Sequence, residues 1–235
     1  MILLQTPTQI AQDSLQQAAA TLDSTALSIS MFDLFSKGGW IMYVLLAFLL
    51  MAIYIFIERI LVIGKAGKED DSFMNRIKDY MQDDKIDAAL ALCRKTDTPS
   101  ARMVEKGISR LGRPAADIMS TIENEGNIEV AQLEKGLALL ASTASIAPML
   151  GFLGTVTGMV KAFMSMASAG SNVNITILST GIYEALVTTV GGLIVGIIAL
   201  FAYNYLTTLV KGIVNKLESR IMEFMDILNE PVVKQ

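Results

Sequence analysis

Several residue types that carry protein chemistry are absent or scarce in this chain of 235 residues. It contains no histidine and a single cysteine, Cys93. Without histidine there is no catalytic triad built on an imidazole base, and one cysteine cannot form a disulfide within the chain. The carboxylates are scattered among lysines, a pattern that does not indicate a metal site. We therefore expect no enzyme activity, no metal and no cofactor.

Charged residues are also few. They make up 18% of the chain, against 52% hydrophobic residues, and the mean hydropathy is +0.49. This composition is too apolar for an ordinary soluble domain of this length. Three apolar runs, at residues 38–57, 137–160 and 175–210, are long enough to cross a hydrocarbon core about 30 Å thick. The sequence thus predicts an all-α integral membrane protein with three transmembrane helices.

Lysine and arginine are distributed unevenly along the chain. Residues 1–36 and the short segment 169–174 have none, whereas residues 58–135 hold thirteen of the 19. Because cytoplasmic segments carry an excess of Lys and Arg, we expect the N-terminus outside and the middle segment and C-terminus in the cytoplasm. Lys37 and Lys161 are exceptions at the outer ends, too few to reverse this orientation.

The predicted organisation follows from these spans. Residues 1–37 lack the basic start and uninterrupted apolar core of a signal peptide, and we interpret them as a periplasmic amphipathic segment on the membrane surface. The other predicted segments are transmembrane helices at 38–60, 137–166 and 175–207, a cytoplasmic helical domain at 61–136, a short periplasmic turn at 167–174 and a cytoplasmic C-terminal helix at 208–235.

Long helices are expected to extend from the spans into the cytoplasm. Pro99 and Pro114 mark breaks in the middle segment. After Pro114 the helical pattern continues into the second span, which predicts one helix on the order of 50 residues and about 75 Å. Helices of this length need packing partners, so we expect a homo-oligomer. The third span continues through an apolar stripe made of Leu209, Ile213, Leu217, Ile221 and Phe224.

Small residues recur at four-residue spacing in the second and third spans, a pattern typical of close helix packing in membranes. We expect Pro148 to kink the second span, because it removes a backbone donor. The residues to which we assign the packing role are Gly151, Gly154, Gly158, Gly192 and Gly196.

Glu184 is the only charged residue between Lys161 and Lys211. An ionised carboxylate near the middle of a bilayer costs roughly 2.5 to 3.5 kcal/mol on insertion scales, and such residues usually mark ion or proton pathways. We hypothesise a proton path lined by Glu184 and nearby hydroxyls. The alternatives are a structural, protonated glutamate and threonines that bond only to the carbonyl one turn back. The threonines concerned are Thr155, Thr157, Thr188 and Thr189.

Three stretches carry a family resemblance. They read LALLASTASIAPMLGFLGTVTGM at 137–159, GIYEALVTTVGGLIVGIIALFAYN at 181–204 and IDAALALCRKTDTPSARMVEKGI at 86–108. Together they resemble the signatures of the MotA/TolQ/ExbB proton-channel family, and most closely its ExbB/TolQ branch, over about residues 35–225. Three spans with an outside N-terminus fit ExbB and TolQ, whereas the flagellar protein MotA has four. Many ExbB chains have a proline where this chain has Ile198.

The resemblance implies a subunit of a motor driven by the proton motive force in the bacterial inner membrane. Five copies would surround the single spans of two ExbD/TolR-type subunits, each with a protonatable aspartate, and would energise a TonB- or TolA-like protein. It assigns Glu184, Thr155 and Thr189 to the pore, with protons as the transported ion and no nucleic-acid partner. Glu184 and Thr189 lie about 140° apart round a helix, so Thr188 remains a second candidate.

Other functions stay open at this point. A TolQ-like subunit of an envelope-maintenance motor would share these features. A non-conducting oligomeric scaffold would need the same packing without proton flux. A secondary transporter is expected to show internal repeats and broken helices, which the sequence lacks.

Overall fold

The computed structural model describes residues 39–68, 72–168 and 175–229, and this part of the chain is helical throughout, with no strand. The predicted periplasmic segment 1–37 and residues 169–174 of the predicted turn 167–174 lie outside the described residues, whereas residues 167 and 168 of that turn are helical. Within the described residues the helices are α3 (Gly39–Ala66), α4 (Phe73–Gln82), α5 (Ile86–Thr96), α6 (Pro99–Ile108), α7 (Ala115–Glu134), α8 (Leu137–Ser168) and α9 (Ile175–Asn229).

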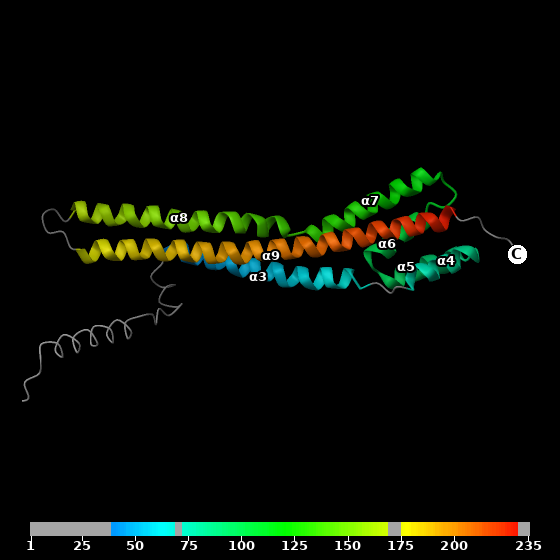
Figure 1. Ribbon diagram of the computed structural model, residues 1–235, viewed down its shortest axis with the longest axis horizontal. Coiled ribbons are helices and arrows are strands. Elements are labelled where there is room, and N and C mark those ends of the chain that lie inside the picture. The colour runs from blue at the N-terminus through cyan, green and yellow to red at the C-terminus, as the bar shows by residue number, and fades with distance from the viewer. Residues whose placement is uncertain (1–38, 69–71, 169–174, 230–235) are drawn as a thin grey trace, which may run out of the picture.

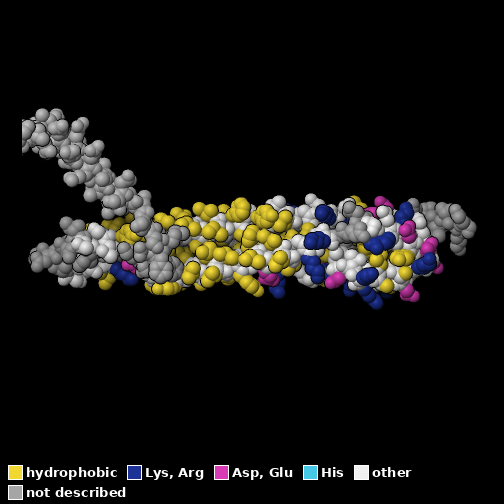
Figure 2. All heavy atoms as spheres, turned by 90° about the horizontal axis from the view of Figure 1, so that it is seen from below, with side chains coloured by type: hydrophobic (Ala, Val, Ile, Leu, Met, Phe, Trp, Pro, Cys, Tyr) yellow, Lys and Arg dark blue, Asp and Glu magenta, His cyan; other side chains and the backbone are white. Residues whose placement is uncertain are grey.

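Three apolar helices run side by side along the long axis of the molecule (Figure 1). In the described residues α3, the α7–α8 segment and α9 are long and apolar enough to cross a membrane, as predicted. Apolar side chains cover the visible surface along these three helices, and most of the charged side chains lie toward the end of the molecule where α4 to α7 are (Figure 2). Many of the apolar side chains are large and exposed, including Tyr54, Phe152 and Phe201. Such a surface is suited to lipid or to other membrane-embedded helices.

α9 continues without a break from the apolar region to the end of the molecule where α4 to α7 lie, as its apolar stripe predicts. Its 55 residues give a length of about 80 Å at 1.5 Å per residue. Ile213, Leu217 and Phe224 of the stripe are buried in the main core. α4, α6 and α7 of the same chain cover this part of α9. The stripe is therefore an intrachain contact.

The prediction of a single helix from residue 115 into the second span is wrong, because the helix is interrupted at residues 135 and 136. α7 ends at Glu134, α8 begins at Leu137, and the two helices lie at an angle to each other (Figure 1). Gly136 between them has φ +86°, a left-handed conformation that ends α-helical hydrogen bonding and that glycine adopts without a Cβ clash. The Nη1 of buried Arg59 on α3 donates to the carbonyl of Gln132 at 2.9 Å and holds the end of α7.

The predicted proline breaks lie at helix starts. Pro99 is in the first turn of α6, behind extended Thr98, whose hydroxyl accepts a hydrogen bond from the Ala101 amide at 3.3 Å. Pro114 directly precedes the first residue of α7. These breaks allow α4, α6 and α7 to pack against α9, with α5 on α4 and α6, and together they form much of the main core.

Cys93 lies within that core and is 1% exposed. Burial raises the pKa of its thiol to about 12, and the nearby Glu105 carboxylate adds to this effect. A thiol in this state holds almost no thiolate near neutral pH and is a poor nucleophile. Cys93 therefore acts as a small apolar core residue.

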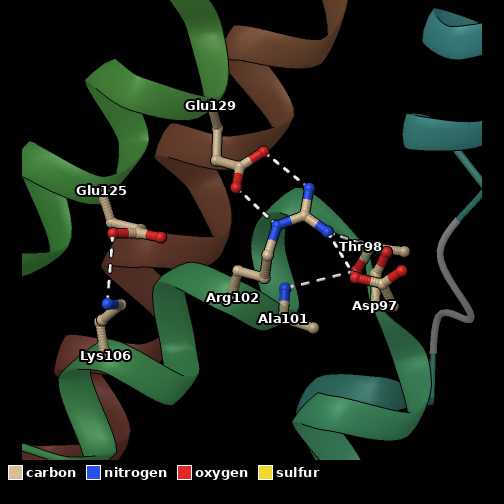
Figure 3. A network of polar contacts seen from close by, with 7 residues as sticks. All are labelled: Asp97, Thr98, Ala101, Arg102, Lys106, Glu125 and Glu129. Atoms are coloured by element: carbon tan, nitrogen blue, oxygen red, sulfur yellow. Dashed lines mark hydrogen bonds and ion pairs between the residues drawn. The ribbon is translucent and has the colours of Figure 1, made fainter. Parts of the chain in front are cut away.

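A polar network ties α6 to α7 and to the end of α5 (Figure 3). The Arg102 guanidinium donates to both carboxylate oxygens of Glu129, at 2.5 and 2.7 Å, and to Asp97 at 2.7 Å. Glu129 is 3% exposed. The hydrogen bond to Glu129 raises the pKa of Arg102, which stays charged at any pH where the protein folds.

Replacing Arg102 with Met is expected to destabilise the packing of α6 on α7 by about 3 kcal/mol, because it leaves the Glu129 carboxylate buried without its partner. Thermal unfolding in detergent would measure the loss. Lys106→Met is the matched control on the same helix, since its 3.8 Å contact with Glu125 is partly exposed and should contribute less than about 1 kcal/mol. An equal loss of stability in the two variants would contradict a stabilising role for the buried Arg102–Glu129 pair.

Candidate functional site

α8 and α9 pack closely along a line of small residues in the membrane region. A Cβ added to Gly192 would stand 2.6 Å from the Ala147 carbonyl oxygen and 2.9 Å from the Cα of Gly151. At Gly196 it would meet the ring of Pro148 at 2.7 Å. The backbones come into contact at Gly151 and Gly192 because neither of these residues carries a side chain. The assigned packing residues therefore join two helices of the same chain.

The small-residue contact extends further toward the α8–α9 connection than the glycine motif alone indicates. A Cβ on Gly158 would lie 3.0 Å from the Ala185 Cβ. A Cβ on Gly181 would lie 2.7 Å from that of Ala162. These contacts define the register of the helix pair, and residues beside them on either helix are brought together.

Thr155 on α8 and Thr189 on α9 form a pair across the interface. Their hydroxyl oxygens are 2.5 Å apart. Both hydroxyls also lie within hydrogen-bond distance of the Gly151 carbonyl, at 3.3 Å from Thr155 and 3.1 Å from Thr189. Both side chains are half-buried. The pair that the family resemblance assigns to the pore is thus one connected polar group.

Thr188 lies on a different face of α9. Its side chain is 2% exposed and packs against Gly154, and its hydroxyl donates to the Ala185 carbonyl at 2.8 Å. Its burial in the helix contact distinguishes it from the half-buried Thr155 and Thr189. Thr188 therefore serves α8–α9 packing, although it also borders the cavity described next.

Glu184 is half-buried in a narrow crevice where the start of α3 meets α8 and α9. One carboxylate oxygen lies 2.5 Å from the position that a Cβ on Gly39 would occupy, and Gly39 has φ +65°, a conformation that glycine adopts without a Cβ clash. The crevice has a volume of about 10 Å³, room for about one water molecule. Its lining includes Thr157, Thr188 and Lys161.

The structure therefore divides the predicted site in two. Glu184 and Thr188 share the crevice, whereas Thr155 and Thr189 pair with each other about 7.5 Å farther along α9, five residues on at 1.5 Å each. The sequence interpretation did not include Lys161 and Gly39, which border Glu184. The sequence could have identified Lys161, because this residue lies three positions after Gly158 and therefore beside the same packing face of the helix.

The site offers one carboxylate, one cation on the exposed Lys161 and a hydroxyl pair, all on helices that are apolar and long enough to cross a membrane. Such a set can hold and release a proton, since a carboxylate in apolar surroundings changes its charge when the environment changes. Hydroxyl pairs donate and accept hydrogen bonds and can steady a proton-carrying water.

This chain resembles known proteins over most of its length. The model of the MotA/TolQ/ExbB proton channel family matches residues 95–219. The Tol-Pal system protein TolQ of Haemophilus influenzae is 30% identical over 216 residues, covering 86% of this chain and 94% of that protein. A putative biopolymer transport protein, an ExbB homolog of Methanothermobacter thermautotrophicus, is 25% identical over 80% of this chain and 67% of its own length.

A further relative is the putative biopolymer transport protein ExbB-like 1 of Synechocystis, 29% identical over 76% of this chain and 71% of that protein. The residues that match the family model include the Thr155–Thr189 pair, Glu184 and α9 as far as residue 219. The chain is a multi-pass membrane protein, and it belongs to the MotA/TolQ/ExbB proton channel family.

Proposed function

We propose that this chain is the ExbB-like subunit of an inner-membrane proton-channel motor. With an ExbD/TolR-type partner it uses the proton motive force to energise TonB-dependent transport across the outer membrane. Glu184 carries this proposal, because it is the sole charged residue between Lys161 and Lys211 and lies half-buried where three membrane helices meet. Each proton crossing about 100 mV releases roughly 2.3 kcal/mol, which a motor can use only if a site holds and releases it.

The proposed assembly is a pentamer in the bacterial inner membrane, with two partner spans in its pore. The broad apolar surface of α3, α8 and α9 supports association with further helices. The α8–α9 glycines do not provide the contact between copies, since they are used within one chain. The faces left for neighbours carry larger side chains such as Phe152 and Ile197.

A TolQ-like subunit of a Tol-type motor is the second candidate function. The observation in its favour is the match to Haemophilus influenzae TolQ, which extends over 94% of that protein. The two candidates differ in the protein that receives the energy. Co-purification with a TonB-like rather than a TolA-like protein would decide between them.

Proton flux tests the function itself. Vesicles that contain this chain and its single-span partner should acidify when a membrane potential is applied, and vesicles with either subunit alone should not. A pH-sensitive dye inside the vesicles measures the rate. Oligomers that bind the partner but conduct no protons would show a scaffold rather than a channel.

The proposed topology has its own test, since Lys and Arg gather on one side. In a Cys93→Ser background, cysteines placed at Asp23 and Asn172 should react with an impermeant thiol reagent added to spheroplasts. A cysteine at Gln82, which is exposed on α4, should react only after the membrane is opened. Rapid labelling of position 82 in intact spheroplasts would overturn the orientation.

A further inference from the structure

A pocket of about 250 Å³ lies where the end of α3 meets α9 and the start of α6. Ala66 and Gly67, at and just after the end of α3, form one wall of it. A Cβ on Gly67 would lie 3.8 Å from the Ile213 side chain of α9, which also lines the pocket. Ser100 lines it from the first turn of α6. The pocket is thus built from three helices and is separate from the Glu184 crevice.

Two cations of α9, Lys216 and Arg220, line this pocket. Arg220 donates to the Glu223 carboxylate at 2.8 Å, so part of its charge is already neutralised. Lys216 is exposed and forms no ion pair within the described residues. No acidic side chain lines the pocket in that part of the chain. The pocket therefore offers a positive charge to an anion.

Ser100 adds hydrogen-bond donors beside this charge. The residue is 4% exposed, and its hydroxyl has no hydrogen-bond partner among the described residues. The first amides of a helix also lack acceptors within the helix. In α6, Pro99 has no amide hydrogen, and the amide of Ala101 donates to the Thr98 hydroxyl. The amide and hydroxyl of Ser100 are left, and a helix N-terminus with such donors beside a lysine suits a phosphate oxygen.

The pocket lies just beyond the apolar surface of α3. Leu61 and Val62 are exposed apolar residues, and Ala66 follows four positions after Val62, about 6 Å along the helix. The polar headgroup region adds roughly 5 to 8 Å on each side of a hydrocarbon core. When the apolar surface of α3 lies in the hydrocarbon, the pocket is therefore level with the lipid phosphates.

We propose that this pocket binds the phosphate group of an anionic phospholipid, with Lys216 as the charged contact and Ser100 as the hydrogen-bond donor. Basic pockets between membrane helices bind anionic headgroups in this way. The inference is independent of the proposed proton path and assigns a lipid site to the other end of the apolar helices. A bound lipid joins the end of α3 to α6 and α9.

Native mass spectrometry of the full chain in a neutral detergent, with phosphatidylglycerol added, measures the bound lipid. We expect Lys216→Gln to lower the affinity about fivefold, the typical effect of losing one lysine near an anionic lipid surface. Lys216→Arg should keep the affinity, and phosphatidylcholine, whose headgroup has no net charge, should bind more weakly. Displacement of the lipid by inorganic phosphate at equal concentration would indicate a site for a soluble anion and would overturn the proposal.

Lys211→Gln is the matched control. Lys211 is an exposed lysine of the same helix, five positions nearer to the apolar part of α9 and about 140° round the helix from Lys216. Its replacement should keep the affinity, and a loss as large as in Lys216→Gln would show general attraction to the lipid rather than a pocket. An equal fall in the unfolding temperature of Lys216→Gln with and without lipid would mean that Lys216 pairs within the chain, for instance with the acidic run at residues 69–71, and would also overturn the proposal.

Discussion

Glu184→Gln is expected to assemble with its partner as the unchanged protein does, yet to lose energy coupling by roughly tenfold or more. Glutamine keeps the size and hydrogen bonding of the side chain but cannot ionise, and a positioned proton-transfer group typically contributes about 10²- to 10⁴-fold to a rate. The crevice against Gly39 admits the amide without rearrangement, because its shape matches that of the carboxylate. Partner-dependent proton flux at matched expression is the deciding measurement.

Two variants serve as controls for this prediction. Glu184→Asp has a shorter reach but still titrates, so it should retain part of the flux. Thr155→Ala removes one hydroxyl of the pair with Thr189 and should reduce coupling less than Glu184→Gln, since a hydroxyl adds polarity but does not titrate near neutral pH. Full flux in Glu184→Gln would show that this carboxylate is structural and that the partner's aspartate suffices.

Gly192→Leu should destabilise the α8–α9 pair itself. The new side chain would meet the Ala147 carbonyl oxygen and the Gly151 backbone, and backbone atoms cannot move aside as a flexible side chain can. Overpacking of this kind typically costs about 1 to 3 kcal/mol, occasionally more. We expect a lower unfolding temperature in detergent, together with reduced yield of the folded protein.

Gly212→Leu is the control for this substitution. Gly212 is also on α9, but a Cβ there meets no atom within 4 Å in this chain. Leucine at Gly212 should therefore have little effect on the unfolding temperature of the chain. Gly192→Leu could instead unfold at the same temperature as the unchanged protein while its oligomer dissociates. That result would show that the glycines join different copies and that the intrachain contact does not stabilise the fold.

The sequence alone determined the class of this protein and pointed to Glu184 as a candidate site residue. Hydropathy is a property of each segment by itself, so three membrane spans follow from composition without knowledge of their arrangement. The same holds for Glu184, whose isolation in an apolar run marks it without any partner being known. Local patterns also located the helix starts at Pro99 and Pro114.

Tertiary structure decided what depends on neighbouring helices. The pattern of residues 115–160 is helical throughout, and only the packing of α3, with Ile55 against Gly136 and Arg59 on the end of α7, shows that the chain bends there. Helical periodicity defines faces but does not say which helix covers each face. It therefore could not separate Thr188, in the packed interface, from Thr189, which pairs with Thr155.

For the same reason, the sequence did not show that Lys161 and Glu184 line the same crevice. In the sequence it is separated from Glu184 by 23 residues and reads only as an exception to the charge distribution. The register between α8 and α9, set by Gly158 against Ala185, brings the two charges to one crevice. That register results from backbone contact between small side chains, so only the folded pair of helices defines it.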